Sequence, residues 1–271
     1  MKKKRFLHIL HILFFILFSQ YVQAQESYYI LYNEGNYEKL EKRLVQVIAN
    51  QPNNILFNHV YGKLYATQAY SKYNLDQAYK YLLNAKELFA AAQINEKERL
   101  AKFNLTQRII QHDFDTVCTK LYDITIAKNT IEDCNLFINT YSKAPKEIRD
   151  KIVNHRNDLA YKETMKANTL EAFQSFISTY PQADQKIEAI KIRDEIAYDQ
   201  AIKINTPDAF KSYVQQYPQS EFTPKIKMLY AQRLFAEQTK NGDYQSFAKF
   251  ITANPKSEMA PYAIIEMVKI A

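Results

Sequence analysis

The sequence predicts an all-α protein, a right-handed α-solenoid of stacked antiparallel helical pairs. Three observations support this fold class. Apolar residues recur at the i, i+3, i+4 spacing of helices and do not alternate as in strands. Only 3 glycines occur in 271 residues, although sheets joined by tight turns usually need more. Segments of the C-terminal half align with a period of 37 residues, as in helical repeats that stack into solenoids.

The first residues have the pattern of a secretory signal peptide cleaved after Ala24. Basic residues precede an apolar stretch from Phe6 to Phe18, and Val22 and Ala24 are small enough for the cleavage site. The apolar stretch is shorter than the roughly 20 residues that span a membrane. Because Gln25 follows in place of a lipid-acceptor cysteine, we expect a soluble mature protein, periplasmic or secreted, without a stable membrane span.

Charge gives no support for nucleic-acid binding. Cleavage would remove four of the 36 basic residues and leave 32 against 29 acidic ones. A nucleic-acid-binding protein would instead carry a basic patch or stripe.

The N-terminal half reads as irregular helical pairs over residues 25–112. A turn is expected at Gly35–Tyr37, and the next helix ends at Gln51–Asn54. Ile55–Tyr70 and Leu75–Ala92 then form an antiparallel pair. The charged stretch Ala92–His112 is expected to be a solvated joining helix, with a domain seam near residues 104–114. One face of the first helix holds Leu40, Leu44, Val47 and Ile48.

Residues 113–271 read as an array of about four repeats of 37–39 residues. A weaker first copy has an offset of 39 and includes Tyr122, Asn129, Phe137 and Tyr141. The aromatic columns are expected to form the core between neighbouring helices. One aromatic column holds Tyr161, Tyr198 and Phe235, and a second holds Phe173, Phe210 and Phe247. A third column holds Tyr180, Tyr217 and Asn254, each of which precedes a proline. A fourth, which is not aromatic, holds Asn168, Asn205 and Gly242.

Each repeat is expected to hold a long helix, a short loop and a shorter helix. In one copy the long helix covers Asp184–Lys203 and a loop follows at Asn205. Thr206 is a good N-cap for the next helix, with Pro207 at its first position. Tyr217 before a proline ends that helix. The apolar positions of the long helix are Ile187, Ile190, Ala197, Ala201 and Ile204.

The two cysteines, Cys118 and Cys134, are expected to be separate buried thiols. They lie 11 residues before and 5 residues after the expected helix joint at Asn129. At about 1.5 Å per residue this gives an axial offset of about 9 Å. A disulfide needs Cα atoms within about 7 Å.

Two parts of the chain resemble known helical repeats. Asn74–Lys86 is similar to the second helix of a tetratricopeptide repeat. The units around Tyr180–Pro181 and Tyr217–Pro218 resemble repeats of periplasmic helical proteins related to the outer-membrane assembly lipoprotein family. Together these cover about four-fifths of the mature chain, although tryptophan is absent and the repeats exceed the usual ~34 residues. The resemblance implies a binding scaffold and leaves its partner unidentified.

The sequence shows no recognisable catalytic, metal or cofactor-binding motif. His59, His112 and His155 lie far apart and have no carboxylate or cysteine at ligand spacing. The adjacent carboxylates Asp194 and Glu195 fit a solvated helix face. We therefore predict a protein that is not an enzyme and binds no cofactor.

Two candidate protein-binding surfaces follow. The first is tyrosine-rich, since tyrosine is favoured at interfaces, and packing between helices is the alternative. The second is the last helix, Met259–Ile270, which is apolar nearly all round and lacks the short partner helix of a repeat. It either docks on a partner or a second copy, or caps the array with those residues buried. The residues are Tyr61, Tyr65, Tyr70 and Tyr73 for the first surface and Ile264, Ile265 and Val268 for the second.

The predicted function is that of an exported, non-enzymatic scaffold for protein–protein interaction in the cell envelope. The alternative is an accessory subunit of outer-membrane assembly or transport machinery. A protein or peptide partner and self-association through the C-terminal helix are both expected.

Overall fold

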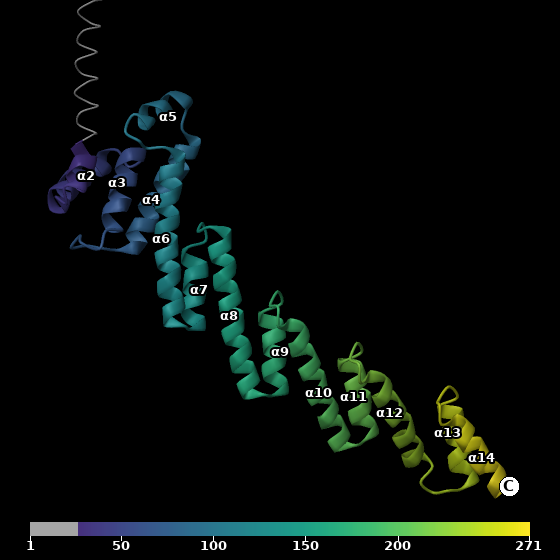
Figure 1. Cartoon of the computed structure of the whole chain (residues 1–271). Coiled ribbons are helices and arrows are strands. Elements are labelled where there is room, and N and C mark those ends of the chain that lie inside the picture. Colours follow the sequence, from purple (N-terminus) through teal and green to yellow (C-terminus); the bar gives the residue numbers. More distant parts are fainter. Residues whose placement is uncertain (1–26) are drawn as a thin grey trace, which may run out of the picture. The chain divides into compact units, whose positions relative to one another are not determined.

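A computed structural model describes residues 27–271 (Figure 1). Within this range the regular structure is entirely helical and no strand occurs, which confirms the predicted all-α class. No helix in residues 27–271 is long and apolar enough to cross a membrane. The predicted signal peptide and its cleavage site lie outside the described residues.

The chain divides into two compact units, residues up to 156 and residues 157–271, and the boundary lies inside α8 (Lys146–Ala167). The division that the sequence predicts, into residues 25–112 and 113–271 with a domain seam near residues 104–114, stays a prediction.

In the first unit, successive helices pack as neighbours. Residues 27–33 are helical, and a turn at Gly35, with φ of +74°, leads into the next helix as predicted. Contacts join α2 to α3, α3 to α4, α4 to α6, and α6 to α7. The helices are α2 (Tyr37–Asn50), α3 (Ile55–Tyr65), α4 (Leu75–Ala91), α5 (Ile94–Ala101), α6 (Gln107–Lys128) and α7 (Ile131–Thr140).

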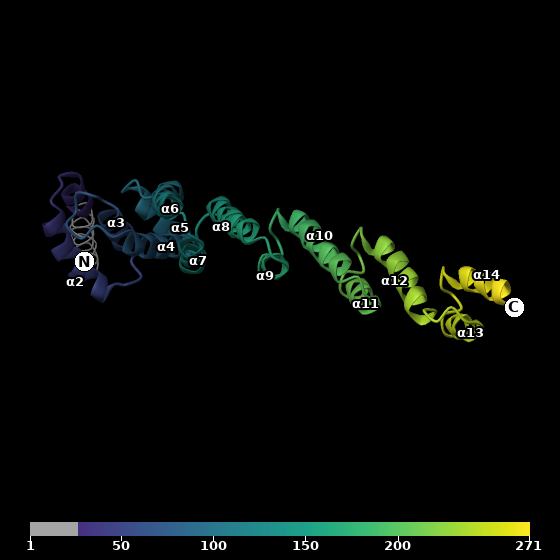
Figure 2. The same ribbon diagram turned by 90° about the horizontal axis from the view of Figure 1, so that it is seen from below.

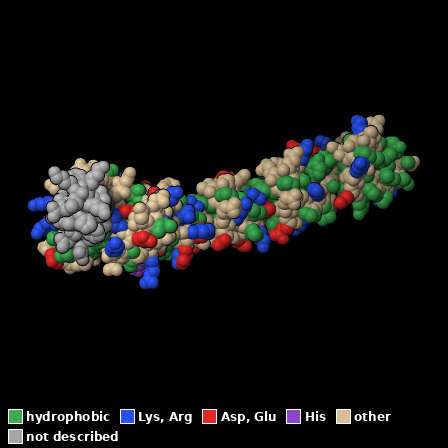
Figure 3. Space-filling model, turned by 90° about the horizontal axis from the view of Figure 1, so that it is seen from above, with side chains coloured by type: hydrophobic (Ala, Val, Ile, Leu, Met, Phe, Trp, Pro, Cys, Tyr) green, Lys and Arg blue, Asp and Glu red, His purple; other side chains and the backbone are tan. Residues whose placement is uncertain are grey.

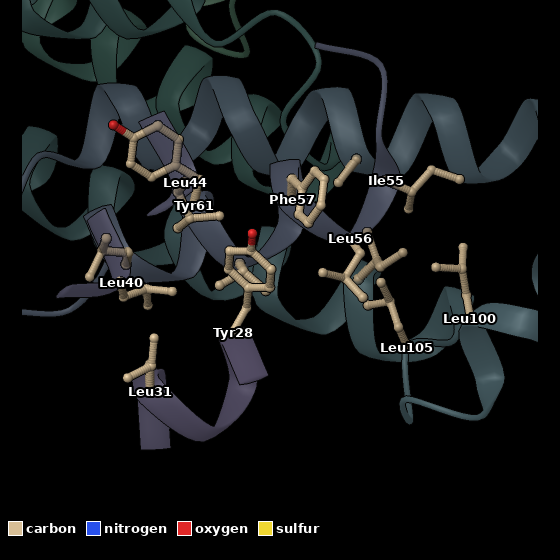
Figure 4. Close-up of a cluster of buried hydrophobic side chains, with 14 of the residues drawn as sticks. Tyr28, Leu31, Leu40, Leu44, Ile55, Leu56, Phe57, Tyr61, Leu100 and Leu105 are labelled. Carbon is tan, nitrogen blue, oxygen red and sulfur yellow. The ribbon is translucent and has the colours of Figure 1, made fainter. Parts of the chain in front are cut away.

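The predicted solvated helix over Ala92–His112 is wrong. The chain instead forms α5, turns at Asn104 with φ of +58°, and starts α6. Leu100 and Leu105 are fully buried, and Ile110 joins them in the same hydrophobic cluster as the core of α2 and α3 (Figure 4). The charged residues between them, Lys102 and Arg108, stay exposed, so burial of these apolar side chains costs no solvation of charge.

The helix predicted to run from Ile55 to Tyr70 ends at Tyr65. Asn74 closes the following loop, because its backbone N–H donates to the Tyr65 carbonyl at 3.0 Å and its side chain accepts from the backbone of α4. Gly62 on α3 lies directly against Leu82 of α4. A Cβ atom there would lie 2.6 Å from Cγ of Leu82, so only glycine fits without displacing α4.

In the second unit each short helix packs on the long helix that follows it, which Figures 1 and 2 both show. Contacts join α9 to α10, α11 to α12, and α13 to α14, and weaker contacts connect these pairs. Neighbouring contacts of this kind are those of a helical-pair solenoid. The helices are α9 (Leu170–Thr179), α10 (Lys186–Ile204), α11 (Pro207–Gln216), α12 (Thr223–Gln238), α13 (Tyr244–Ala253) and α14 (Ala260–Ile270).

Helix ends explain the repeating Asn/Gly column. Asn168, Asn205 and Gly242 all have positive φ, between 46° and 68°, a conformation that glycine and asparagine tolerate best. The next residue caps the short helix in every copy. Thr169, Thr206 and Asp243 accept a hydrogen bond from the backbone N–H three residues on, as do Thr106 and Thr130 in the first unit.

The aromatic columns form the core as predicted. Phe173, Phe210 and Phe247 are buried, and Tyr161 contacts the ring of Phe176 at 5.3 Å. The predicted apolar positions of α10 are partly wrong, because Ile187 and Ile204 are 71% and 61% exposed. Ala197 and Ala201 are buried as predicted, and Ala189 joins them as a third small side chain through which the helix packs.

Cys118 and Cys134 are both buried and free, as expected. They lie on α6 and α7, which join at Asn129 as predicted. Burial raises the pKa of the Cys118 thiol to about 12 and also raises that of Cys134. Both are therefore neutral thiols at neutral pH, and neither has the reactivity of a thiolate.

Candidate functional site

The tyrosines predicted to form a binding surface are divided between core and surface. Tyr61 and Tyr70 are buried, which corrects the expectation that they offer contact area, while Tyr65 and Tyr73 remain partly exposed. The ring centroids of Tyr61 and Tyr65 lie 4.9 Å apart, and Tyr65 and Tyr70 are in edge contact at 5.8 Å. Tyr81 on α4 extends the cluster, with its ring 4.7 Å from that of Tyr61.

Tyr81 also lines a cavity of the first unit, which we call the α4 groove. Its volume is about 750 Å³, and one face of α4 forms its floor. The end of α2 and the α2–α3 loop border one side, and the end of α7 borders the other. Apolar and aromatic lining comes from Ile48, Tyr79, Tyr81, Leu83 and Tyr141.

Hydrogen bonds hold both sides of the α4 groove. On one side, the Tyr141 hydroxyl donates to Asp76, and the ring of Tyr141 meets Tyr79 edge-on at 5.0 Å. On the other side, Asn84 Nδ2 donates to Asn58 Oδ1 at 2.9 Å, and Asn58 Nδ2 donates to the Pro52 carbonyl at 2.7 Å. Both sides are therefore fixed before any ligand arrives, which lowers the entropy cost of binding.

The chemistry of the α4 groove suits an amphipathic segment. The charged groups Asp76, Lys80 and Glu87 alternate in sign along α4 beside the apolar floor. Apolar side chains of a partner would pack on the apolar floor, and its charged side chains would pair with Asp76, Lys80 or Glu87. Mostly apolar pockets with a few placed polar groups are typical binding sites.

The structure also brings together a polar cluster that the sequence did not reveal. The Tyr29 hydroxyl donates to His59 Nδ1 at 2.8 Å, and His59 Nε2 donates to Asp113 Oδ2 at 2.8 Å. A carboxylate only accepts, so Nε2 is assigned the proton and Nδ1 accepts. Lys63 Nζ lies 3.6 Å from the same Asp113 oxygen. No sequence signal could have found this cluster, because its members are up to 84 residues apart.

This cluster has the order hydroxyl, imidazole, carboxylate, and the pKa of each of these three groups is shifted. His59 is 1% exposed, and desolvation lowers its pKa. The pKa of Asp113 is also lowered: its burial opposes this, but the hydrogen bond from His59 and the charge of Lys63 prevail. Burial raises the pKa of Tyr29, so its hydroxyl stays neutral. The cluster ties residues 27–33 to α3 and α6.

Asp194 corrects a second sequence interpretation. It is 5% exposed and therefore does not lie on a solvated face. Its carboxylate pairs with Arg193 at 2.6 Å, and its backbone carbonyl accepts from the Tyr213 hydroxyl at 3.3 Å. Tyr213 also bonds Ser220 at 2.7 Å. This buried polar network fastens α10 to α11.

The second predicted surface, on α14, is exposed. Ile264 and Ile265 are each 51% exposed and Val268 is 73% exposed. The alternative of a cap that buries these side chains is therefore wrong, and only Ala260 and Ala263 of this helix are buried. Hydrophobic side chains gather over this end of the second unit in the space-filling view (Figure 3).

Comparison with α12 shows that these positions face outward in the repeat itself. One period of 37 residues earlier, Tyr262 corresponds to Lys225 and Ile264 to Lys227. Both lysines are exposed, while Ile226, equivalent to the buried Ala263, is fully buried. The α12 equivalents of Ile265 and Val268 are Met228, which is also exposed, and Ala231, which is partly buried, so only Lys227 replaces an apolar residue of these three with a charged one.

No protein-family model matches the chain, and no curated protein sequence matches it significantly. Among residues 27–271, no group of three or more His, Cys, Asp or Glu side chains could hold a metal ion.

Proposed function

We propose that the protein is an exported, non-enzymatic helical-repeat scaffold that binds a protein or peptide partner in the cell envelope. The observation that carries this proposal is the α4 groove, a fixed cavity of about 750 Å³ with an apolar floor and a charged edge. Helical-repeat proteins commonly bind partners on such surfaces. The predicted signal peptide and the resemblance to periplasmic repeat proteins support the proposed location.

The partner fits the groove as an amphipathic segment that places apolar side chains over Leu83 and Tyr81. Burying one aliphatic side chain contributes roughly 1.5–3 kcal/mol. Replacing Leu83 with lysine is therefore expected to weaken binding about tenfold or more.

Site-specific photo-crosslinking tests the proposal. A photoreactive amino acid replaces Leu83 in the native cell, and crosslinked products are identified by mass spectrometry. We expect a discrete partner from position 83. The matched control is position 187, because Ile187 is exposed on α10 and is not among the residues that line the α4 groove.

The proposal is contradicted if both positions give the same products, or if position 83 gives none while the protein remains folded by circular dichroism. Recovery of an outer-membrane assembly or transport complex from position 83 would favour the more specific role of an accessory subunit of that machinery.

A further inference from the structure

A second cavity of the first unit lies beside the His59–Asp113 pair, and its volume is about 360 Å³. Residues 27–33 and α3 line part of it, and the loop between α5 and α6, with the first turn of α6, lines the rest. We call this cavity the basic pocket. Its lining includes Tyr29, Ile30, Lys63, Lys102, Phe103 and Ile109.

The basic pocket carries positive charge. Lys63 and Lys102 line it, and no Asp or Glu is among its described lining residues. The Asp113 carboxylate lies outside the lining and is held by His59 at 2.8 Å and by Lys63 at 3.6 Å. Lys102 is exposed and forms no ion pair within residues 27–271. The pocket therefore favours an anion.

The same cavity holds apolar side chains. Ile30 is 49% exposed and Ile109 is 37% exposed, and Phe103 is partly buried. A ligand with an apolar group would remove these side chains from water, which is favourable. Two cations together with apolar lining distinguish this pocket from the α4 groove, whose charges are of both signs.

Hydrogen bonds join the elements around the basic pocket before a ligand arrives. The Tyr29 hydroxyl donates to His59 Nδ1 and His59 Nε2 donates to Asp113, both at 2.8 Å. These two bonds connect residues 27–33, α3 and α6. A cavity formed in advance lowers the entropy cost of binding.

The loop that carries Lys102 and Phe103 is also fixed. The backbone N–H of Leu105 donates to the Leu100 carbonyl at 3.1 Å, and both leucine side chains are fully buried. Between them, Asn104 turns the chain with φ of +58°. The ends of the loop are thus anchored in the core, and Lys102 and Phe103 are held at the pocket.

We propose that the basic pocket binds a small organic anion, with a carboxylate or phosphate group on Lys63 and Lys102 and an apolar group on Ile30, Phe103 and Ile109. Lysine forms charge-assisted hydrogen bonds with both kinds of anion. The volume of about 360 Å³ lies near the lower end of the range of roughly 300–1,000 Å³ for small-molecule sites, so the ligand is small. This binding site goes beyond the scaffold function and shares no lining residue with the α4 groove.

Ligand-observed NMR titration of the mature chain, residues 25–271, with benzoate and with phenyl phosphate tests the proposal. Each probe joins one anionic group to an aromatic ring, so the tighter of the two identifies the preferred anion. We expect that probe to bind with a Kd of about 1 mM or below. Benzylamine has the ring with a positive charge, and inorganic phosphate has no ring. Both should bind at least about tenfold more weakly.

Substitutions place the probe in the basic pocket. Lys102→Glu reverses an exposed charge and should raise the Kd about tenfold or more, with unchanged thermal stability. Ile30→Ser removes exposed apolar lining and should raise it about fivefold. Lys80→Glu is the matched control, because Lys80 is exposed and lines the α4 groove instead, and it should leave the Kd unaltered.

The proposal is overturned if neither aromatic anion binds at about 10 mM, ten times the expected Kd, or if Lys102→Glu binds as tightly as the wild type. Equal binding of benzylamine would show that negative charge is not selected, and equal binding of inorganic phosphate would show that the apolar group is not. Either result would overturn it, as would loss of binding in Lys80→Glu. None of these results bears on crosslinking from position 83, so failure here is distinguishable from failure of the scaffold function.

Discussion

Residues 157–271 and the unit before them are both built from packed helices, but different contacts hold their helices together. In the later unit every short helix begins with a Thr or Asp cap after a residue of positive φ, and the same aromatic columns fill each pair. In the earlier unit α7 follows the same rule at Asn129 and Thr130, but α3 is held by individual contacts, such as the approach at Gly62 and the pairing of His59 with Asp113.

The difference shows two ways of specifying a helical pair. A repeated rule is local, since each cap and each left-handed residue acts within one turn of its own helix. An individual contact depends on two segments that meet only after folding. Substitutions at the cap or at the left-handed residue should therefore lower the free energy of unfolding by similar amounts in each copy. Substitutions at an individual contact should lower it by amounts that differ from site to site.

The largest effect is expected at Gly62. Gly62→Ala places a Cβ atom 2.6 Å from Cγ and 3.0 Å from the backbone N of Leu82, and overpacking of this kind typically costs about 1–3 kcal/mol. Urea unfolding measures the loss. Leu82→Ala in the same chain makes room for the new methyl group, so the double variant should lose less than the sum of the two single losses. Simple additivity would contradict the close approach.

A smaller effect is expected at Asn168, where φ is +46°. Asn168→Ala leaves a β-carbon in the left-handed region and removes the short polar side chain that lets asparagine tolerate this conformation, at a cost of up to about 1–2 kcal/mol. Asn168→Gly, the residue that the repeat uses at Gly242, should stay within about 0.5 kcal/mol of wild type. The comparison is made by thermal unfolding. If both variants lose the same stability, the asparagine side chain stabilises this position and its positive φ does not.

The smallest effect is expected from the titration of His59. Its pKa is lowered below the ordinary value of 6.5 by burial, so the unfolded chain takes up the proton first as the pH falls. The contribution to stability is complete above pH 6.5 and declines below it, by at most about 1.4 kcal/mol per pH unit. Asp113, whose pKa is lowered from 3.8, adds a further decline in more acidic solution.

Chemical denaturation at several pH values measures this decline. His59→Gln keeps an amide that can donate toward Asp113 but does not titrate, so its stability should change less between pH 6.5 and the lowered pKa. His112→Gln, at an exposed histidine, is the control. If the stability of His59→Gln depends on pH as that of the wild type does, titration of His59 does not contribute to the stability of the first unit.

By itself, the sequence determined the helical class, the period of the repeat and most helix ends. The loop at Asn205, the cap at Thr206 and the stop at Tyr217 all lie where the sequence predicts them. These features depend on residues within about one helical turn of each other, so a single stretch of sequence contains the whole interaction.

Only the tertiary structure decided which helix faces are buried. Asp194 is buried although its neighbours are charged, Ile187 is exposed although it is apolar, and His59 meets a carboxylate 54 residues away. The α4 groove likewise needs α2, α4 and α7 to come together. Periodicity gives a helix its faces, but burial depends on which other segments pack against each face, and that is settled by the sum of all contacts in the folded chain.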